Sequence, residues 1–285
     1  MYDVKHWIQD YVSCLPDLDY SRSGLNFHCD SEDIPNIFHF VYTTPEDRLD
    51  FKLFEHIAIK SCFHVNKPEK IMFHYVNEPT GEWWEKSKTY LTLNKVELPT
   101  HCFDKKISHP AHCADMLRMQ ALISEGGIYA DLDTIFINKI PEELFKENLV
   151  MAEEDDVALC NAVVMCKKNS KFAIRWFKDF ETEFHEDQWA NHSVHHPRRL
   201  SYQLPTQIKV IDRTCFYGYH WSEINRLYGE RVPDWLKVED VKFLSLHLWH
   251  SMEGTDYINT VTEDMIVNDP HYNFYNFLAY PYLVN

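Results

Sequence analysis

Apolar residues in the first part of the chain alternate between short continuous runs and helical spacings. The run at residues 35–42 is apolar and is followed by Thr43-Thr44-Pro45, which predicts a buried strand. Residues 48–64 carry apolar side chains at a helical spacing, and residues 71–76 form the next apolar run. An order of strand, helix and strand predicts an open α/β sheet.

The same order continues through residue 137. We expect a short helix over 82–88, a strand over 93–98 and a helix over 108–125. Gly126-Gly127 ends that last helix, since glycine is favoured just past a helix C-terminus. Residues 128–133 then read as a strand that continues into 133–137.

The second half of the chain has a weaker pattern. Residues 149–153 and 161–166 are predicted strands, and an aromatic stripe at i, i+4 spacing (Phe172, Trp176, Phe180, Phe184) predicts an amphipathic helix. No strong period runs through 186–235, and 241–249 is a last candidate strand. The absence of repeats and linkers predicts one domain over 1–285, with an N-terminal extension (1–33), a ligand-binding part (34–166) and a second part (167–285).

Composition excludes several classes of protein. The chain has 285 residues, 45% hydrophobic and 25% charged, as in soluble globular proteins. Its formal net charge is −16 and its basic runs are no longer than a pair, so we expect no nucleic-acid partner. With 7 glycines and no glycine-rich phosphate loop, most Rossmann dehydrogenases and P-loop NTPases are excluded.

The cysteines and the N-terminus bear on the compartment. Eight cysteines are scattered without any C-x-x-C pair, which favours free thiols in a reducing compartment over a set of disulfides. The start of the chain has no apolar leader, and no 18-residue apolar run predicts a membrane span. We therefore expect a cytoplasmic protein.

Carboxylates gather around the predicted strand at 128–133. Side chains alternate along a strand, so Tyr129, Asp131 and Asp133 share a face. Carboxylates at i, i+2 lie about 6 to 7 Å apart at the backbone and can share one hard cation, with coordination positions left for diphosphate oxygens. Asp115 and Arg118 share a face of the preceding helix, where they form either a surface ion pair or part of the same site.

The order of these residues resembles a known family. Asp115-x-x-Arg118 followed by G-G-I-Y-x-D-x-D at 126–133 is similar to the D-x-D sugar-binding region of glycosyltransferase family 32. That group includes α-1,4-galactosyl- and N-acetylglucosaminyltransferases, the yeast initiating α-1,6-mannosyltransferase and, more distantly, the clostridial glucosylating toxins. Residues 34–42 resemble the family's opening strand, so the similarity covers about 34–166, roughly half the chain. By this resemblance 34–166 would be the nucleotide-sugar-binding part and 167–285 the acceptor-side part. Animal and fungal members of the family usually lie in the Golgi behind an N-terminal anchor, so a Golgi lumen is the alternative to the cytoplasm if such an anchor lies outside this sequence.

The resemblance implies a fold, a cofactor and a reaction. The fold would be of the GT-A nucleotide-sugar-binding type, an open mixed sheet flanked by helices. The enzyme would use Mn²⁺, or Mg²⁺, to transfer a hexose from a UDP- or GDP-sugar to a carbohydrate or other hydroxyl acceptor, with retention of anomeric configuration.

The resemblance also implies roles in binding the donor. Val41 would contact the base through its backbone, and Tyr42 would stack on the base where relatives carry Trp. Asp115 and Arg118 would hold sugar hydroxyls, with Tyr129 beside them.

Further roles concern the metal and the transfer centre. Asp131 would contact the ribose and the metal, Asp133 would bind the metal directly, and Asn161 would lie near the sugar, so that Asp115, Arg118 and Asn161 form the catalytic group. His247, in a segment that resembles the family's H-L-W-x-x-x-W, would complete the metal shell, although the second Trp is missing here. A strand-capping Asn161 and a buried structural His247 are the alternatives.

Two other features favour simpler interpretations. The acidic run at 153–156 is predicted to be a solvated turn, with acceptor binding as the alternative. His192, His195 and His196 are predicted to lie in a flexible loop, because their spacing fits no pattern of metal ligands. Two other functions remain open: a catalytically silent glycan- or nucleotide-sugar-binding protein, and a metal-dependent phosphohydrolase.

Overall fold

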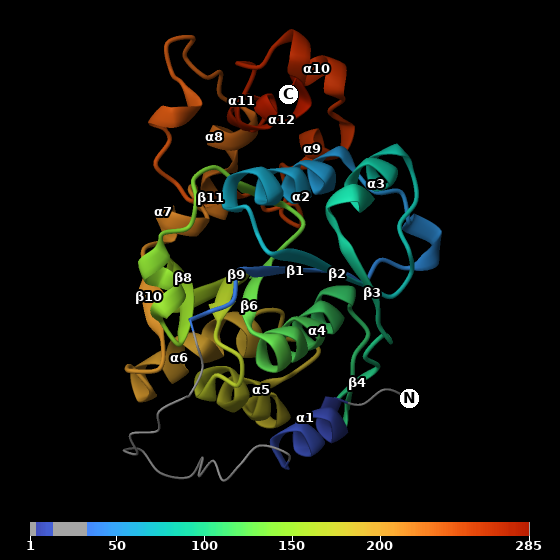
Figure 1. Ribbon diagram of the computed structural model, residues 1–285, viewed down its shortest axis with the longest axis vertical. Coiled ribbons are helices and arrows are strands. Elements are labelled where there is room, and N and C mark those ends of the chain that lie inside the picture. Colours follow the sequence, from blue (N-terminus) through green and yellow to red (C-terminus); the bar gives the residue numbers. More distant parts are fainter. Residues whose placement is uncertain (1–3, 14–32, 285) are drawn as a thin grey trace.

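A computed structural model describes residues 4–13 and 33–284 (Figure 1). The predictions for Cys14, Cys29 and most of the N-terminal extension lie outside these residues. Seven strands form one sheet in the order β10-β8-β9-β6-β1-β2-β3. In chain order these strands are β1 (Ile37–Tyr42), β2 (Lys70–Tyr75), β3 (Thr92–Lys95), β6 (Gly127–Ala130), β8 (Leu149–Asp155), β9 (Ala158–Cys166) and β10 (Lys209–Ile211).

The sheet is mixed. β1 pairs in parallel with β2 and β6, and β2 pairs in parallel with β3, whereas β9 runs antiparallel to both β6 and β8. Two small ribbons accompany it: β4 (His101–Cys102) with β5 (Lys105–Lys106), and β7 (Thr134–Phe136) with β11 (Ser245–His247). The predicted α/β class, an open mixed sheet flanked by helices, is confirmed.

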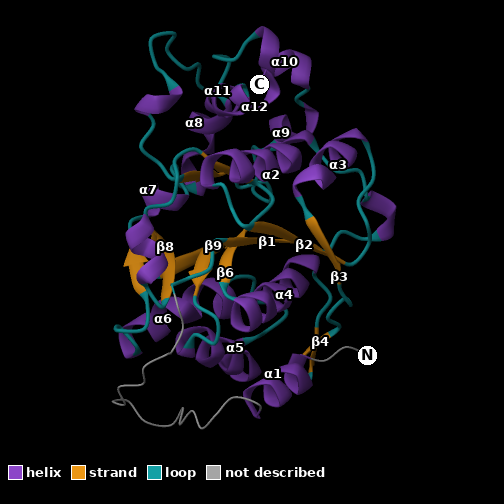
Figure 2. Cartoon of the chain, in the orientation of Figure 1, coloured by secondary structure: helices purple, strands orange, loops and turns teal. Residues whose placement is uncertain are grey.

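Helices cover both faces of the sheet (Figure 2). One face packs against α2 and the C-terminal helices, and the other packs against α4 and α5, each over its own hydrophobic cluster. The longer helices are α1 (Val4–Ser13), α2 (Leu53–Asn66), α4 (Pro110–Glu125), α5 (Lys171–Glu183) and α6 (His196–Gln203). The short helices are α3 (Glu82–Ser87), α7 (Arg213–Phe216), α8 (Ile224–Tyr228), α9 (Asp256–Thr260), α10 (Glu263–Asn268), α11 (Phe274–Ala279) and α12 (Pro281–Val284).

The connection from α4 to β6 confirms the predicted glycine helix end. Gly126 and Gly127 have φ of 71° and 115°, the left-handed region that favours glycine. A Cβ on Gly127 would lie 2.3 Å from the carbonyl oxygen of Ile37, so only glycine lets β6 approach β1 this closely.

Two predicted strands are shorter than expected. β6 ends at Ala130, and Asp131 to Asp133 form a turn in which the Thr134 amide donates to the Asp131 carbonyl at 3.1 Å. The strand expected over 241–249 is only three residues long, because its partner β7 is itself three residues long. The carboxylates therefore lie on a turn and not on one strand face.

Two further findings concern the cysteines and the helices. The six cysteines of the described residues form no disulfide with one another. Within residues 4–13 and 33–284, no helix is both long enough and apolar enough to cross a membrane.

Two buried histidines link β1, β2 and β3 at one end of the sheet. His39 Nε2 lies 2.8 Å from the Gly126 carbonyl oxygen, His39 Nδ1 lies 3.0 Å from His74 Nε2, and His74 Nδ1 lies 2.9 Å from Asn94 Nδ2. Because a carbonyl can only accept, His39 donates through Nε2 and accepts from His74, which in turn accepts from Asn94. Both rings are thus neutral, and burial lowers the pKa of His39 and lowers that of His74 to about 3.

This arrangement predicts that the protein loses stability in acid. The unfolded chain takes up a proton on His74 below about pH 6.5 while the folded chain does not, so the free energy of unfolding falls as pH drops from 7 towards 3. Between pH 7 and 5 the His74 contribution is about 2 kcal/mol. Glutamine keeps a hydrogen-bond donor but does not titrate. We therefore expect His74→Gln to remove this part of the fall in the free energy of unfolding, as measured by urea unfolding at a series of pH values.

The control for this prediction is His64→Gln, at an exposed position of α2. The control should keep the wild-type pH dependence. An identical pH dependence in His74→Gln and wild type would contradict the neutral relay.

Candidate active site

A cavity of about 560 Å³ opens where β1 and β6 end. Val41 borders it at the end of β1, and the first turns of α2 and α4 contribute further side chains. Carboxyl ends of neighbouring parallel strands are the usual ligand site of an open α/β sheet. Eight residues that the sequence singled out line the cavity: Val41, Asp115, Arg118, Tyr129, Asp131, Asp133, Asn161 and His247.

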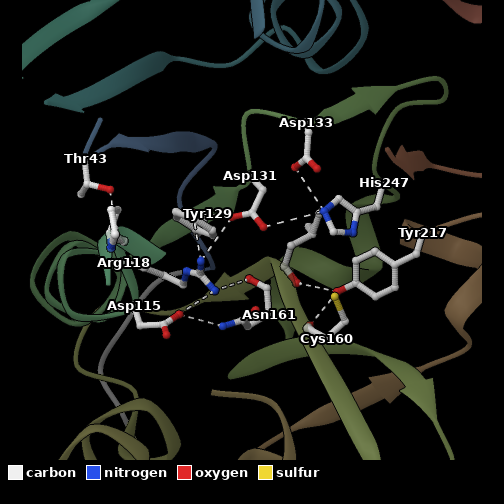
Figure 3. A network of polar contacts seen from close by, with 12 residues as sticks. Thr43, Asp115, Arg118, Tyr129, Asp131, Asp133, Cys160, Asn161, Tyr217 and His247 are labelled. Atoms are coloured by element: carbon white, nitrogen blue, oxygen red, sulfur yellow. Dashed lines mark hydrogen bonds and ion pairs between the residues drawn. The ribbon is translucent and has the colours of Figure 1, made fainter. Parts of the chain in front are cut away.

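The guanidinium of Arg118 lies at the centre of a polar network (Figure 3). It donates to the carbonyl of Asn161 at 2.9 Å, to the hydroxyl of Tyr129 at 3.1 Å and to Asp131 Oδ1 at 3.2 Å. It also stacks over the Tyr129 ring, 4.1 Å from its centroid. The Tyr129 hydroxyl donates in turn to Asp131 Oδ1, so one strand and one helix are joined through this group.

Asp115 is held from three sides. Asn161 Nδ2 donates to Oδ1 at 3.0 Å, His192 Nε2 lies 3.0 Å from Oδ2, and Arg118 Nη1 lies 3.4 Å from Oδ1. Burial raises the pKa of Asp115, but the hydrogen bond from His192 and the charge of Arg118 outweigh it and hold the pKa below its ordinary value. Asp115 is therefore an ionised, oriented carboxylate.

The interpretation of Asp115 and Arg118 as a surface ion pair is wrong. Asp115 is 6% exposed and Arg118 is 5% exposed. The helix face that they share is turned to the sheet, because α4 packs beside β1 and β6.

Asp131, Asp133 and His247 form a second group. Each offers a ligand atom within 4.8 Å of the others. His247 Nε2 lies 3.1 Å from Asp133 Oδ1 and 3.8 Å from Asp131 Oδ2. The β7–β11 ribbon makes this contact, since Leu248 N donates to the Asp133 carbonyl at 2.8 Å.

Charge in this group is closely balanced. Burial raises the pKa of Asp133, but the charge and hydrogen bond of His247, with the backbone amide of His250, lower it to about 2. Burial lowers the pKa of His247, but Asp133 raises it well above its usual value, so His247 carries a proton here. Two carboxylates and an imidazole are a donor set that can hold a divalent cation, and such a cation would take the place of that proton.

The structure does not bring Tyr42 to the cavity. Its side chain is 3% exposed and packs against Phe51 and Phe73 in the cluster under α2. Alternation along β1 turns Val41 to the α4 side and Tyr42 to the opposite side. The base-stacking role predicted for Tyr42 does not fit this placement.

Sequence reasoning missed His192. It lies in a π-helical turn at Asn191–His195, is fully buried, and packs edge-on against Phe180 and Phe184. A flexible loop was therefore the wrong prediction for this segment. The only sequence signal is its position after the aromatic stripe of α5, which does not specify the contact with Asp115.

The predicted solvated turn accounts for only part of the acidic run at 153–156. Asp155 and Asp156 are exposed, but Glu153 and Glu154 belong to β8 and Glu154 lines the cavity. Burial raises the pKa of Glu154, and a hydrogen bond from the Trp221 side chain partly offsets this. Glu55 lines the cavity on the α2 side, where burial raises its pKa to about 8.

Comparisons with known proteins agree with this geometry. Residues 53–154 match the family described as a glycosyltransferase sugar-binding region containing the DXD motif. Glucan organizing enzyme 1 of Cryptococcus neoformans var. grubii is 30% identical over 267 residues, which cover 88% of this chain and 71% of that protein.

Solved glycosyltransferases show more distant likeness. GlyE of Streptococcus pneumoniae is 15% identical with a TM-score of 0.46, over 89% of this chain and 61% of its own. The galactosyltransferase LgtC, solved with donor and acceptor sugar analogues, is 12% identical with a TM-score of 0.40, over 80% of this chain and 98% of its own. The family assignment rests on the sequence match: the chain belongs to the glycosyltransferase family whose sugar-binding region contains the DXD motif, family 32.

Proposed function

We propose that this protein is a metal-dependent transferase that moves a hexose from a UDP- or GDP-sugar to a carbohydrate hydroxyl, with retention of anomeric configuration. The observation that carries the proposal is the meeting of Asp131, Asp133 and His247 in the cavity that also holds Arg118 and Asp115. In the transfer, the acceptor O–H bond and the bond from the sugar to the diphosphate break. A glycosidic bond forms, and the nucleoside diphosphate and the proton leave.

The metal would be held by Asp131, Asp133 and His247. When bound, Mn²⁺ or Mg²⁺ supplies positive charge to the diphosphate oxygens of the leaving group. Without such a cation the cavity would repel a diphosphate, because Arg118 is already engaged by Asp115 and Asp131.

The donor sugar would lie against Asp115 and Arg118. The Asp115 carboxylate is ionised and can accept from sugar hydroxyls, and the buried contacts to Asn161 and His192 fix its orientation. Fixed charges of this kind stabilise charge that develops on the sugar in the transition state without reorganising during the reaction. Val41, which lines the cavity, would contact the base through its backbone.

A thermal-shift experiment with UDP, GDP and Mn²⁺ tests the proposal. We expect one nucleotide with Mn²⁺ to stabilise the protein more than either component alone, because binding to the folded state raises the midpoint of unfolding. Asp133→Asn keeps the volume but removes a charged ligand, so it should abolish the joint shift and lower donor turnover at least about tenfold.

Asp156→Asn, at an exposed position of the 155–157 turn, is the matched control and should behave as wild type. No joint stabilisation by any nucleotide and metal would reject the transferase. Nucleotide binding without turnover of any UDP- or GDP-sugar would favour the silent binding protein, and release of inorganic phosphate would favour the phosphohydrolase.

His192→Phe tests whether the orientation of Asp115 matters for the donor. The substitution keeps an aromatic ring among Phe180 and Phe184 but leaves Asp115 Oδ2 without its donor. We expect the free energy of unfolding to fall by about 1–3 kcal/mol, and the donor KM to rise at least fivefold. Urea unfolding and donor kinetics measure the two effects, and His195→Phe in the same turn is the control. A loss of stability with an unchanged donor KM would show that His192 acts only on the fold.

A further inference from the structure

Two tryptophans lie at the cavity without being part of the core. Trp189 precedes the π-helical turn and is 54% exposed, and Trp221 begins a 3₁₀ turn and is 38% exposed; both line the cavity. Trp84 and Trp176, by contrast, lie in the core and are each 1% exposed. Exposed indoles at a pocket cost free energy in water, which is offset when a ligand covers them.

Neighbouring rings limit the movement of both indoles. His109 meets Trp189 edge-on, with ring centroids 4.6 Å apart and planes at 85°. His220 packs against Trp221 with centroids also 4.6 Å apart. An aromatic side chain with few free torsions, already held by a neighbour, loses little entropy when a ligand packs on it.

Carboxyl groups line the same cavity as the two indoles. Glu154 lines the cavity and accepts a hydrogen bond from the Trp221 side chain. Glu55 also lines the cavity, as do Asp115 and Asp131, while the guanidinium of Arg118 is taken up by the latter two. Glu154, which lines the cavity with Trp221, can accept from a ligand that donates hydrogen bonds.

A sugar ring has the matching chemistry. One face of a pyranose presents C–H groups, which pack on an aromatic ring, and its rim carries hydroxyls that donate to a carboxylate. A purely apolar ligand would leave Glu154 without a new partner, and an extended phosphate polymer would meet the chain's net charge of −16.

We propose that Trp189 and Trp221 form the acceptor subsite of this cavity, and that the acceptor is a neutral glycan whose rings pack on the two indoles while Glu154 accepts from a hydroxyl. This inference rests on the proposed function, in which the Asp131 and Asp133 end of the cavity takes the nucleotide sugar. It assigns a use to the 186–235 segment, whose sequence shows no period.

Saturation-transfer NMR tests the subsite without any donor. The probes are methyl α- and β-glycosides of the common neutral hexoses and their disaccharides, added to the whole protein. We expect the C–H protons of at least one probe to receive saturation from wild type. Trp189→Ala and Trp221→Ala should each reduce that signal at least threefold. Trp235→Ala is the matched control, since Trp235 is 76% exposed and lies outside the cavity lining, and it should leave the signal unchanged.

Kinetics provide the second readout. With the donor and metal identified by thermal shift, the acceptor KM should rise at least fivefold in Trp189→Ala and in Trp221→Ala, and more than the donor KM rises. Glu154→Gln should raise the acceptor KM in the same direction.

The outcomes separate the two proposals. The acceptor subsite is overturned if no probe receives saturation from wild type, if the signal persists in both tryptophan variants, or if acceptor and donor KM rise equally. A glycan signal that depends on both tryptophans supports the subsite even where no nucleotide sugar binds, in which case only the transferase proposal fails.

Discussion

The burial of one guanidinium constrains the whole centre of this protein. Arg118 cannot lose its charge. Burial removes the hydrogen bonds that its guanidinium would make to water, so acceptors inside the protein must replace them. Those acceptors come from α4, from β6, from the turn after β6 and from β9. Because the acceptors lie on separate segments, satisfying Arg118 also fixes the relative positions of the elements that border the cavity.

A second constraint follows from the carboxylates that Arg118 does not neutralise. Asp133 has no contact with the guanidinium, and its charge is balanced by protonated His247 across the β7–β11 ribbon. Asp133 and His247 thus bring opposite charges side by side in the buried site. The glycine pair before β6 belongs to the same arrangement, since it brings β6 against β1 and the turn to the cavity.

The sheet and the loops contribute different properties to the cavity. Asp115 and Arg118 come from α4, and β6 and β9 supply Tyr129 and Asn161, which hold them in place. Aromatic side chains such as Trp189 and Trp221 come from connecting turns at the rim. Scaffolds of this kind keep the chemistry fixed while the loops set which ligand is accepted.

The sequence alone determined the fold class and most of the charged site. Apolar runs and helical periods show which segments bury a face, and the order Asp115, Arg118, Gly126-Gly127, Asp131, Asp133 is local enough to be recognised. The tertiary structure alone decided the partners that come from far along the chain: His192 on Asp115, His247 on Asp133 and Trp221 at Glu154. It also decided that Tyr42 lies in the core. Val41 and Tyr42 are both apolar enough to be buried, so the sequence does not show which of them faces which side of the sheet. Periodicity reports which side chains are buried, but contacts between distant segments depend on how the packed elements meet, and no local pattern encodes that.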